Sequence, residues 1–170
     1  QKGMQVLLRA LTGLQGDWIL RIVGDGPYRR VLQSLTAELH LDQRVLFEPR
    51  VPSGEIPRHL NSLDALVLAS LTRHNWKEQF GRVLIEAMAC EVPVVGSSCG
   101  EIAYLIADVG LVFPEGNERA LRNALRRLMG EPALRHELGE RGRARVLEHY
   151  TQKRIAAETY ATYSRLLDRS

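Results

Sequence analysis

The stretch that decides the fold reads EQFGRVLIEAMAC and runs from Glu78 to Cys90. Gly81 lets the backbone turn sharply from a loop into a helix, and lets a ligand come close, because glycine has no Cβ. Apolar residues from Val83 onward continue this helix, which we expect to end before Val92. The first N–H groups of a helix have no internal partner and carry partial positive charge. The start of this helix is therefore predicted to bind an anion such as a phosphate.

Two glutamates, Glu78 and Glu86, flank the start of that helix. Glu78 lies just before it, and Glu86 lies about a turn inside it, roughly 6–8 Å further along at the usual helical rise. Carboxylates accept hydrogen bonds from hydroxyls, which sugars carry in pairs. A diphosphate at the helix start with a carboxylate on either side suits a nucleotide-sugar. The alternative is an amphipathic helix with two solvated glutamates, and the spacing alone does not separate the two interpretations.

Helices and strands alternate in the pattern almost to residue 113. Apolar runs predict buried strands at 18–23, 45–47, 64–69, 92–96 and 110–113. Between them the pattern predicts helices at 4–14, 27–39, 54–61, 81–90 and 101–106. Pro27 fits the first position of its helix, and Ser53 fits a cap. Buried strands joined by helices indicate an α/β fold, a Rossmann-like doubly wound parallel sheet with helices on both faces.

After residue 114 the pattern contains helices only. Asn117 is the expected N-cap of a helix that ends near Gly130, and two more helices are predicted over 133–150 and 151–167. The apolar stripe of the last helix predicts that it packs against another surface. We therefore expect a single domain over residues 1–170, with the C-terminal helices 117–170 packing on it.

The composition indicates which classes of protein this chain can belong to. The 170 residues are 45% hydrophobic, which suits one domain with a substantial core. The net charge of +3 is compatible with an anionic ligand or a membrane surface. Two cysteines do not make a disulfide framework, and no His/Cys cluster has metal-ligand spacing, so we expect no metal. The sequence contains no run of about 20 apolar residues that would predict a membrane span.

Other candidate ligand positions fall at the carboxyl ends of the predicted strands, where doubly wound sheets bind ligands. Gly24, in a Gly-Asp-Gly-Pro turn, is a weak phosphate signal because the third glycine of a dinucleotide fingerprint is missing. The segment Ser97 to Glu101 could supply N–H groups and hydroxyls to a ligand, or could simply cap a helix.

Three further positions have both a functional and an ordinary interpretation. Lys2 precedes the first helix, where a cation opposes the helix dipole, so it is either a ligand contact or a surface lysine. His74 and Trp76 lie in the loop before Glu78 and are candidates for acid–base chemistry and stacking, against ordinary exposed loop positions. Arg119, Arg122 and Arg126 line one helix face, either solvated or in contact with anionic lipid.

The block from Glu78 to Ser97 resembles the signature of the retaining GT-B glycosyltransferases of family 4 (glycosyl transferases group 1). The resemblance covers nearly the whole chain and implies the C-terminal, nucleotide-sugar-binding half of a two-domain GT-B fold. Further segments resemble the family in the same order, namely Val23–Pro27, Arg44–Phe47, Val51-Pro52, Cys99–Ile102 and Gly110–Pro114.

The resemblance also implies roles for individual residues. Glu78 would be the catalytic position and would hold hydroxyls of the donor sugar, while Glu86 would hold the ribose hydroxyls. Lys2 would bind the donor pyrophosphate, with Gly24 near the donor. Backbone groups around Phe80, Gly81, Arg82 and Val83 would approach the sugar and phosphates.

The resemblance implies transfer with retention, with no settled protein nucleophile and generally no bound metal. The donor would be a UDP-, GDP- or ADP-sugar, and we expect no further cofactor. The implied partners are an acceptor glycan or lipid and the N-terminal GT-B domain, and we expect no nucleic acid.

The chain departs from the family pattern in three places, of which Ala103, where a proline is common, matters little. Glu91 stands where glycine is usual, which is tolerable only if that turn does not need a positive φ. The family's first strand of this domain, with an arginine that partners Lys2, would precede Gln1 and would lie in the middle of the sheet. Without it the neighbouring strands would expose unpaired ladder groups, so we expect either that residues upstream of Gln1 exist or that something else fills the gap. We expect the chain to be a fragment of a longer protein and unable to transfer sugar alone.

Two other functions stay open at this point. One is a sugar-nucleotide epimerase or phosphorylase of the same architecture, which product analysis would separate from a transferase. The other is a non-catalytic nucleotide-binding or interaction domain, which the apolar last helix would suit. We expect a cytoplasmic protein, and leave open a peripheral contact at the inner face of the membrane.

Overall fold

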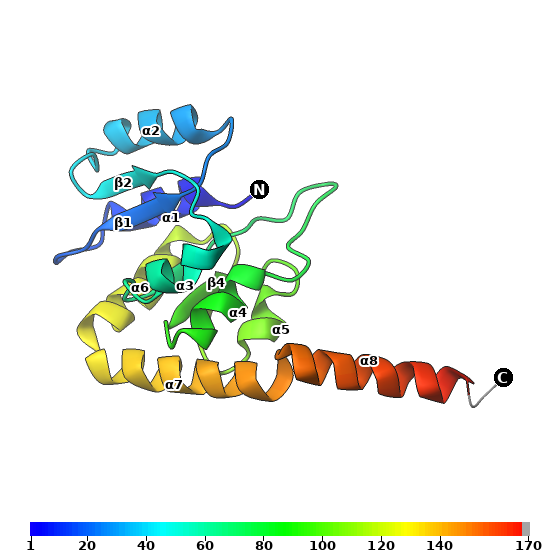
Figure 1. Cartoon of the computed structure of the whole chain (residues 1–170). Coiled ribbons are helices and arrows are strands. Elements are labelled where there is room, and N and C mark those ends of the chain that lie inside the picture. The colour runs from blue at the N-terminus through cyan, green and yellow to red at the C-terminus, as the bar shows by residue number, and fades with distance from the viewer. Residues whose placement is uncertain (168–170) are drawn as a thin grey trace.

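The computed structural model describes residues 1–167, in which helices and strands alternate from α1 to β5 (Figure 1). The strands are β1 Leu20–Val23, β2 Val45–Glu48, β3 Leu66–Leu68, β4 Val94–Ser97 and β5 Leu111–Phe113. The helices among them are α1 Met4–Leu11, α2 Arg29–Glu38, α3 Ile56–Leu60, α4 Arg82–Ala89 and α5 Ile102–Ile106, with a short 3₁₀ turn η1 at Ser53–Glu55. Three helices follow, α6 Glu118–Gly130, α7 Pro132–His149 and α8 Gln152–Leu167.

All strand pairings are parallel, as predicted, but the strands form two sheets rather than one. β1 pairs with β2, and β3, β4 and β5 form a second sheet in that order. No segment among residues 1–167 lies between β1 and β3 to bond either strand, so the ladder is interrupted there. A cavity of about 860 Å³ is lined by both strands and by α1.

Helices cover both faces of the three-stranded sheet, as a doubly wound fold requires. Successive residues of a strand point to opposite faces. Val95 accordingly belongs to a core built with α1 and α6, whereas Val94 belongs to a second core built with α4 and α5. The expected α/β layering with helices on both faces is therefore confirmed.

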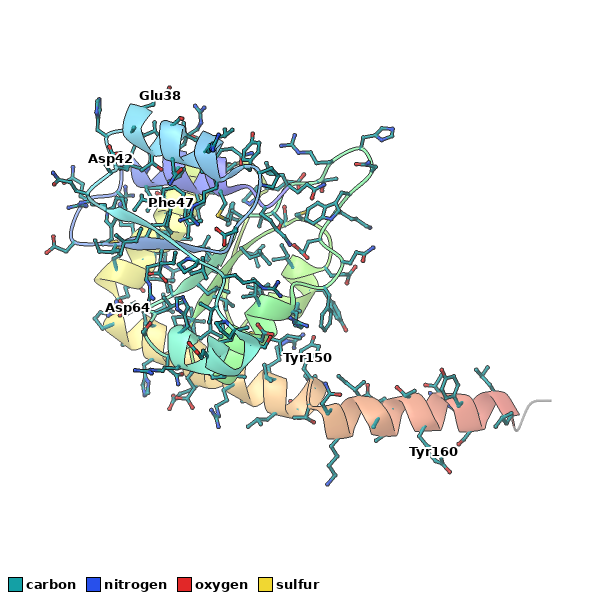
Figure 2. All side chains as sticks on the ribbon, turned by 45° about the horizontal axis from the view of Figure 1, so that its top comes forward. Glu38, Asp42, Phe47, Asp64, Tyr150 and Tyr160 are labelled. Carbon is teal, nitrogen blue, oxygen red and sulfur yellow. The ribbon has the colours of Figure 1, made fainter. Side chains whose placement is uncertain are left out.

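The C-terminal helices behave differently from one another. α6 packs on α1 and β5, and α7 packs on α4, where Gly142 lies against Met88. α8 contains no buried residue among those described and extends away from the body, with Tyr160 pointing clear of it (Figure 2). Among the described residues, α8 packs mainly on α7 and not on the body, unlike the expected packing of all helices of 117–170 on the domain.

Local predictions at the ends of helices were partly right. Asn117 caps α6, with its side-chain oxygen accepting a hydrogen bond from the Ala120 N–H at 2.9 Å. Pro27 instead precedes α2 by two residues, in a turn, and Ser53 lies inside η1 without capping by its side chain. Glu91 has a φ of 58°, so the turn after α4 does need the positive φ that glycine adopts most readily.

Several arginines bond the carbonyl groups at the ends of helices. Arg122 donates to the carbonyl oxygens of Ala10 and Arg9 at the end of α1, and Arg145 donates to those of Leu105 and Tyr104 at the end of α5. Such groups lack partners within the helix. Arg119, Arg122 and Arg126 therefore do not form one uniform solvated face. No helix in the described part of the chain is long and apolar enough to span a membrane.

Candidate functional site

The predicted ligand segments converge at the carboxyl ends of the strands, around two cavities. The first, of about 650 Å³, is lined by Lys2, Gly24, Arg29 and Arg73 among others. The second, the cavity of about 860 Å³ between β1 and β3, extends to Gly24 and to Arg82, Val83 and Glu86 at the start of α4. Gly24 lines both. Its φ of 117° and the open space around its Cα make this strand end accessible.

Lys2 and Glu78 form an ion pair beside the first cavity. Lys2 Nζ lies 2.7 Å from Glu78 Oε2, and the Lys2 side chain is 57% exposed while that of Glu78 is 11% exposed. Lys2 Nζ also lies 5.2 Å from the centre of the Trp76 ring. The structure thus brings an exposed cation and a nearly buried carboxylate together.

The position of Lys2 is set by the backbone on either side of it. The Leu71 N–H donates to the Gln1 carbonyl oxygen at 2.8 Å. Gly3, at a φ of 64°, begins α1 and packs so closely on β3 that a Cβ there would lie 1.7 Å from the Ala69 carbonyl oxygen. Only glycine fits this approach, which ties the N-terminal segment to the end of β3.

The position of Glu78 is set in a similar way from the other side. The Glu101 N–H donates to the Glu78 carbonyl oxygen at 3.1 Å. Gly100, at a φ of 59°, leaves no room for a Cβ, which would lie 1.9 Å from the same oxygen. The Ser70 hydroxyl donates to Glu78 Oε2 at 2.9 Å.

The start of α4 has the predicted geometry. Gly81 has a φ of 74° and begins the helix at Arg82. Arg82 Nε lies 3.1 Å from Glu86 Oε1, so the second glutamate pairs with the first residue of its own helix. The Phe80 ring packs edge-on against Tyr150, with ring centres 6.4 Å apart. Phe80 therefore links the helix start to the end of α7, and its side chain is 46% exposed.

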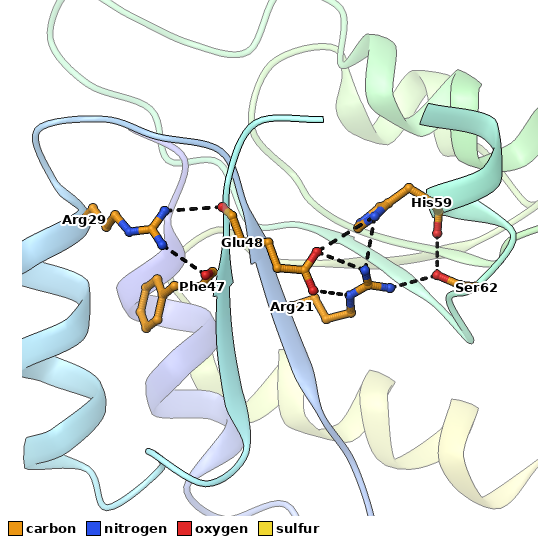
Figure 3. A network of polar contacts seen from close by, with 6 residues as sticks. All are labelled: Arg21, Arg29, Phe47, Glu48, His59 and Ser62. Atoms are coloured by element: carbon orange, nitrogen blue, oxygen red, sulfur yellow. Dashed lines mark hydrogen bonds and ion pairs between the residues drawn. The ribbon is translucent and has the colours of Figure 1, made fainter. Parts of the chain in front are cut away.

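A network of polar side chains lies on the wall of the second cavity (Figure 3). Arg21 on β1 donates to both carboxylate oxygens of Glu48 on β2, at 2.6 and 2.9 Å, and to the Ser62 hydroxyl at 2.8 Å. Arg21 Nη2 lies 3.2 Å from His59 Nδ1. The hydrogen bonds from Arg21 hold the pKa of Glu48 below its ordinary value, despite partial burial. The network fastens α3 to the two-stranded sheet.

The loop before Glu78 is tied to the strand ends at its first residues. Both the N–H and the hydroxyl of Thr72 donate to Glu115 Oε2, at 3.1 and 2.9 Å. These bonds lower the pKa of Glu115. Arg73 and Trp76 pair across the loop through two backbone hydrogen bonds. The Trp76 ring lies beside Lys2. His74 lies at the exposed tip of the loop and makes no described contact with Glu78.

Sequence reasoning did not identify how three residues position this site. Ser70, Gly3 and Gly100 determine the placement of Lys2 and Glu78 through close contacts that no spacing in the sequence indicates. Ser70 does carry one usable signal, since it is a polar residue directly after a buried strand. The sequence left open whether the segment Ser97 to Glu101 binds a ligand or caps a helix. The Ser97 hydroxyl is fully buried and donates instead to the Ser70 carbonyl oxygen at 2.6 Å.

Comparison with known proteins agrees with this geometry. The family model described as Glycosyl transferases group 1 matches residues 1–145. The chain belongs to this family. The expected resemblance to glycosyl transferases group 1 is thereby confirmed.

Relatives of known sequence and solved structures of other proteins match this group 1 chain over most of its length. It is 32% identical over 157 residues to the GDP-mannose-dependent alpha-(1-6)-phosphatidylinositol monomannoside mannosyltransferase of Mycolicibacterium smegmatis, covering 88% of this chain and 41% of that protein. Sucrose-phosphate synthase from Thermosynechococcus elongatus matches at 30% identity with a TM-score of 0.85, covering 99% of this chain and 43% of the other. Anabaena HepE in complex with UDP-glucose matches at 25% identity with a TM-score of 0.85, covering 96% and 45%.

These matches confirm the fold as that of the C-terminal domain of GT-B glycosyltransferases. The chain spans less than half the length of each of the three proteins.

Proposed function

We propose that this chain is the donor-binding domain of a retaining glycosyltransferase of family 4. The whole protein would transfer a sugar from a nucleotide-diphosphate sugar to an acceptor glycan or lipid. The observation that carries the proposal is the Lys2–Glu78 pair at the carboxyl end of β3, beside the start of α4 and its Glu86. Two of the matched proteins have names that include GDP-mannose or UDP-glucose, which supports a nucleotide-sugar donor without selecting its base.

Each group has a chemical task in this proposal. The exposed ammonium of Lys2 binds the diphosphate, since phosphate is a strong acceptor of charged donors. The N–H groups at the start of α4, around Gly81, Arg82 and Val83, bind the same anion through unpaired donors and the helix dipole. Glu78 accepts hydrogen bonds from sugar hydroxyls, and Glu86 accepts them from the ribose.

We also propose that the cavity between β1 and β3 takes a parallel strand of the longer protein. The facing edges of β1 and β3 have no ladder partner among residues 1–167, and unsatisfied buried backbone groups are costly. The cavity wall is largely apolar, with Leu7, Leu11 and Val67 facing it.

Four expectations stay predictions: the N-terminal domain, the acceptor, a cytoplasmic or membrane-peripheral location, and the inactivity of this chain alone.

Calorimetric titration tests the donor site directly. UDP, GDP and ADP are each titrated beside a sugar-bearing form, into the wild-type chain and into Glu86→Gln, with folding checked by circular dichroism. We expect one diphosphate to bind saturably and Glu86→Gln to weaken it. Glu118→Gln, which removes a half-buried carboxylate from the first turn of α6, is the matched control and should bind as wild type. Equal binding by Glu86→Gln and wild type would overturn the role of Glu86.

A further inference from the structure

Ser70 has an unusual partner for a fully buried hydroxyl. Ser70 lies two residues after the end of β3 and is inaccessible to solvent, and its Oγ donates to Glu78 Oε2 at 2.9 Å. Hydrogen bonds to an ionised acceptor are about twice as strong as neutral ones. The contact therefore restricts the carboxylate, whose side chain is 11% exposed, to one orientation.

The two oxygens of the Glu78 carboxylate differ in their surroundings. Oε2 accepts from both Lys2 and Ser70, whereas Oε1 has no hydrogen-bond partner within residues 1–167. No buried side-chain oxygen in that range lacks a partner, so Oε1 reaches solvent. One oxygen is thus held by the protein, and the other is presented to whatever occupies the site.

We propose that Ser70 is a positioning residue that holds Oε2 of Glu78 so that Oε1 faces the hydroxyls of the donor sugar. This proposal rests on the proposed function of Glu78. Ser70 matters most with a donor bound, because the exposed Lys2 side chain can turn to the diphosphate while the buried Ser70 cannot move. Ser70 is then the remaining described donor to Oε2.

The backbone of Ser70 is itself held on both sides. The Ser97 hydroxyl on β4 donates to the Ser70 carbonyl oxygen at 2.6 Å. The next residue, Leu71, donates its N–H to the Gln1 carbonyl oxygen at 2.8 Å. The direction of the Ser70 hydroxyl is consequently set by β3, β4 and the N-terminal segment together, and not by the loop that carries Glu78.

The test compares Ser70→Ala with Thr36→Val, which removes a buried hydroxyl on α2 that donates to the Leu32 carbonyl oxygen and touches neither Ser70 nor Glu78. Dissociation constants are measured for UDP and UDP-glucose, GDP and GDP-mannose, and ADP and ADP-glucose, and the ratio between sugar-bearing and free diphosphate is the readout. We expect Ser70→Ala to lose about tenfold in binding of the sugar-bearing form alone, as one charge-assisted hydrogen bond would supply. Thr36→Val should keep the wild-type ratio. A merely structural role would weaken both ligands alike.

The outcomes separate this proposal from the proposed function. If wild type binds a diphosphate and its sugar-bearing form but Ser70→Ala keeps their ratio, only the positioning role of Ser70 is overturned. If wild type binds none of the six probes, both the donor-site function and this proposal are overturned.

Should Ser70→Ala not fold, Ser70→Cys keeps a side chain of similar shape with a weaker donor. A double-mutant cycle of Ser70→Ala with Glu78→Ala, read by urea unfolding, should show non-additive free energies; additive values would contradict the contact.

Discussion

Lys2 and Glu78 lie 76 positions apart in the chain, yet their side chains meet with Nζ 2.7 Å from Oε2. The contact joins the segment before α1 to the loop before α4, across the end of β3. It also gives the two residues different freedom, because Lys2 is mostly exposed and Glu78 is nearly buried. A ligand can therefore draw Lys2 away while Glu78 stays in place.

This difference predicts separate effects of the two residues on donor binding. Lys2→Met should weaken a nucleoside diphosphate and its sugar-bearing form alike, by about tenfold or more, since one charged contact to phosphate is lost. Glu78→Gln should weaken only the sugar-bearing form. Isothermal titration of both ligands measures this, with Lys77→Met, an exposed lysine of the same loop, as the control. An equal loss of both ligands in Glu78→Gln would contradict the assignment.

Glu91 predicts a stabilising substitution. Its φ of 58° is a left-handed conformation that costs a residue with a Cβ about 1–2 kcal/mol, and glycine's extra chain entropy offsets part of the gain. Glu91→Gly should raise the free energy of unfolding by about 0.5–1 kcal/mol, read from the urea midpoint. The pair of Glu91 with Arg143, at 3.6 Å, is exposed and worth little. Glu91→Ala, which keeps the Cβ, should bring no gain; a gain as large as that of glycine would refute the backbone explanation.

The Arg21–Glu48 pair predicts a pH-dependent contribution to stability. Because the folded state lowers the pKa of Glu48, its contribution is present above the unfolded value and is lost as the pH falls through the folded one. Glu48→Gln should cost about 1–2 kcal/mol at pH 7, as for a hydrogen bond between charged groups. The difference from wild type should shrink below about pH 4.3. Urea unfolding across this range measures it, with Glu55→Gln on η1 as control; a constant difference down to pH 3 would argue against the linkage.

Gly100 predicts a tight steric limit behind Glu78. A Cβ there would lie 1.9 Å from the Glu78 carbonyl oxygen, and the φ of 59° adds strain. Gly100→Ala should lower the free energy of unfolding by about 2 kcal/mol or more, since backbone must shift. Gly54→Ala, where a Cβ meets open space, should change it by far less. Similar urea midpoints for the two variants would show that the contact is not restrictive.

The proposed central strand predicts a change in hydrogen exchange. A chain extended before Gln1 by such a strand should protect amides of β1 and β3, which now face each other across a cavity. We expect exchange of those amides to slow by about tenfold or more, because backbone groups gain ladder partners. Exchange measured by NMR on the two lengths of chain tests this. Unchanged rates, with sharp signals from the added residues, would show that the cavity does not take them.

Much of the fold could be predicted from the local pattern of apolar and polar residues in the sequence. The alternation of apolar runs and helices predicted the parallel strands and the layering, because a strand buried on both faces must be apolar throughout. Gly81 and Asn117 marked the starts of α4 and α6, since a left-handed turn and an N-cap each select particular residues locally. Glu78 and Glu86 stood out by their spacing around one helix start.

The sequence by itself therefore determined which segments are helices and strands and which carboxylates lie near α4, because those features depend on neighbouring residues. Only the tertiary structure decided that β1 and β3 stand apart, that α8 extends from the body, and that Lys2 meets Glu78. The tertiary structure also decided the roles of Ser70, Gly3 and Gly100 in placing Lys2 and Glu78. Their contacts depend on backbones that approach within a few ångströms from distant parts of the chain, and such approach is set by the packing of the whole domain.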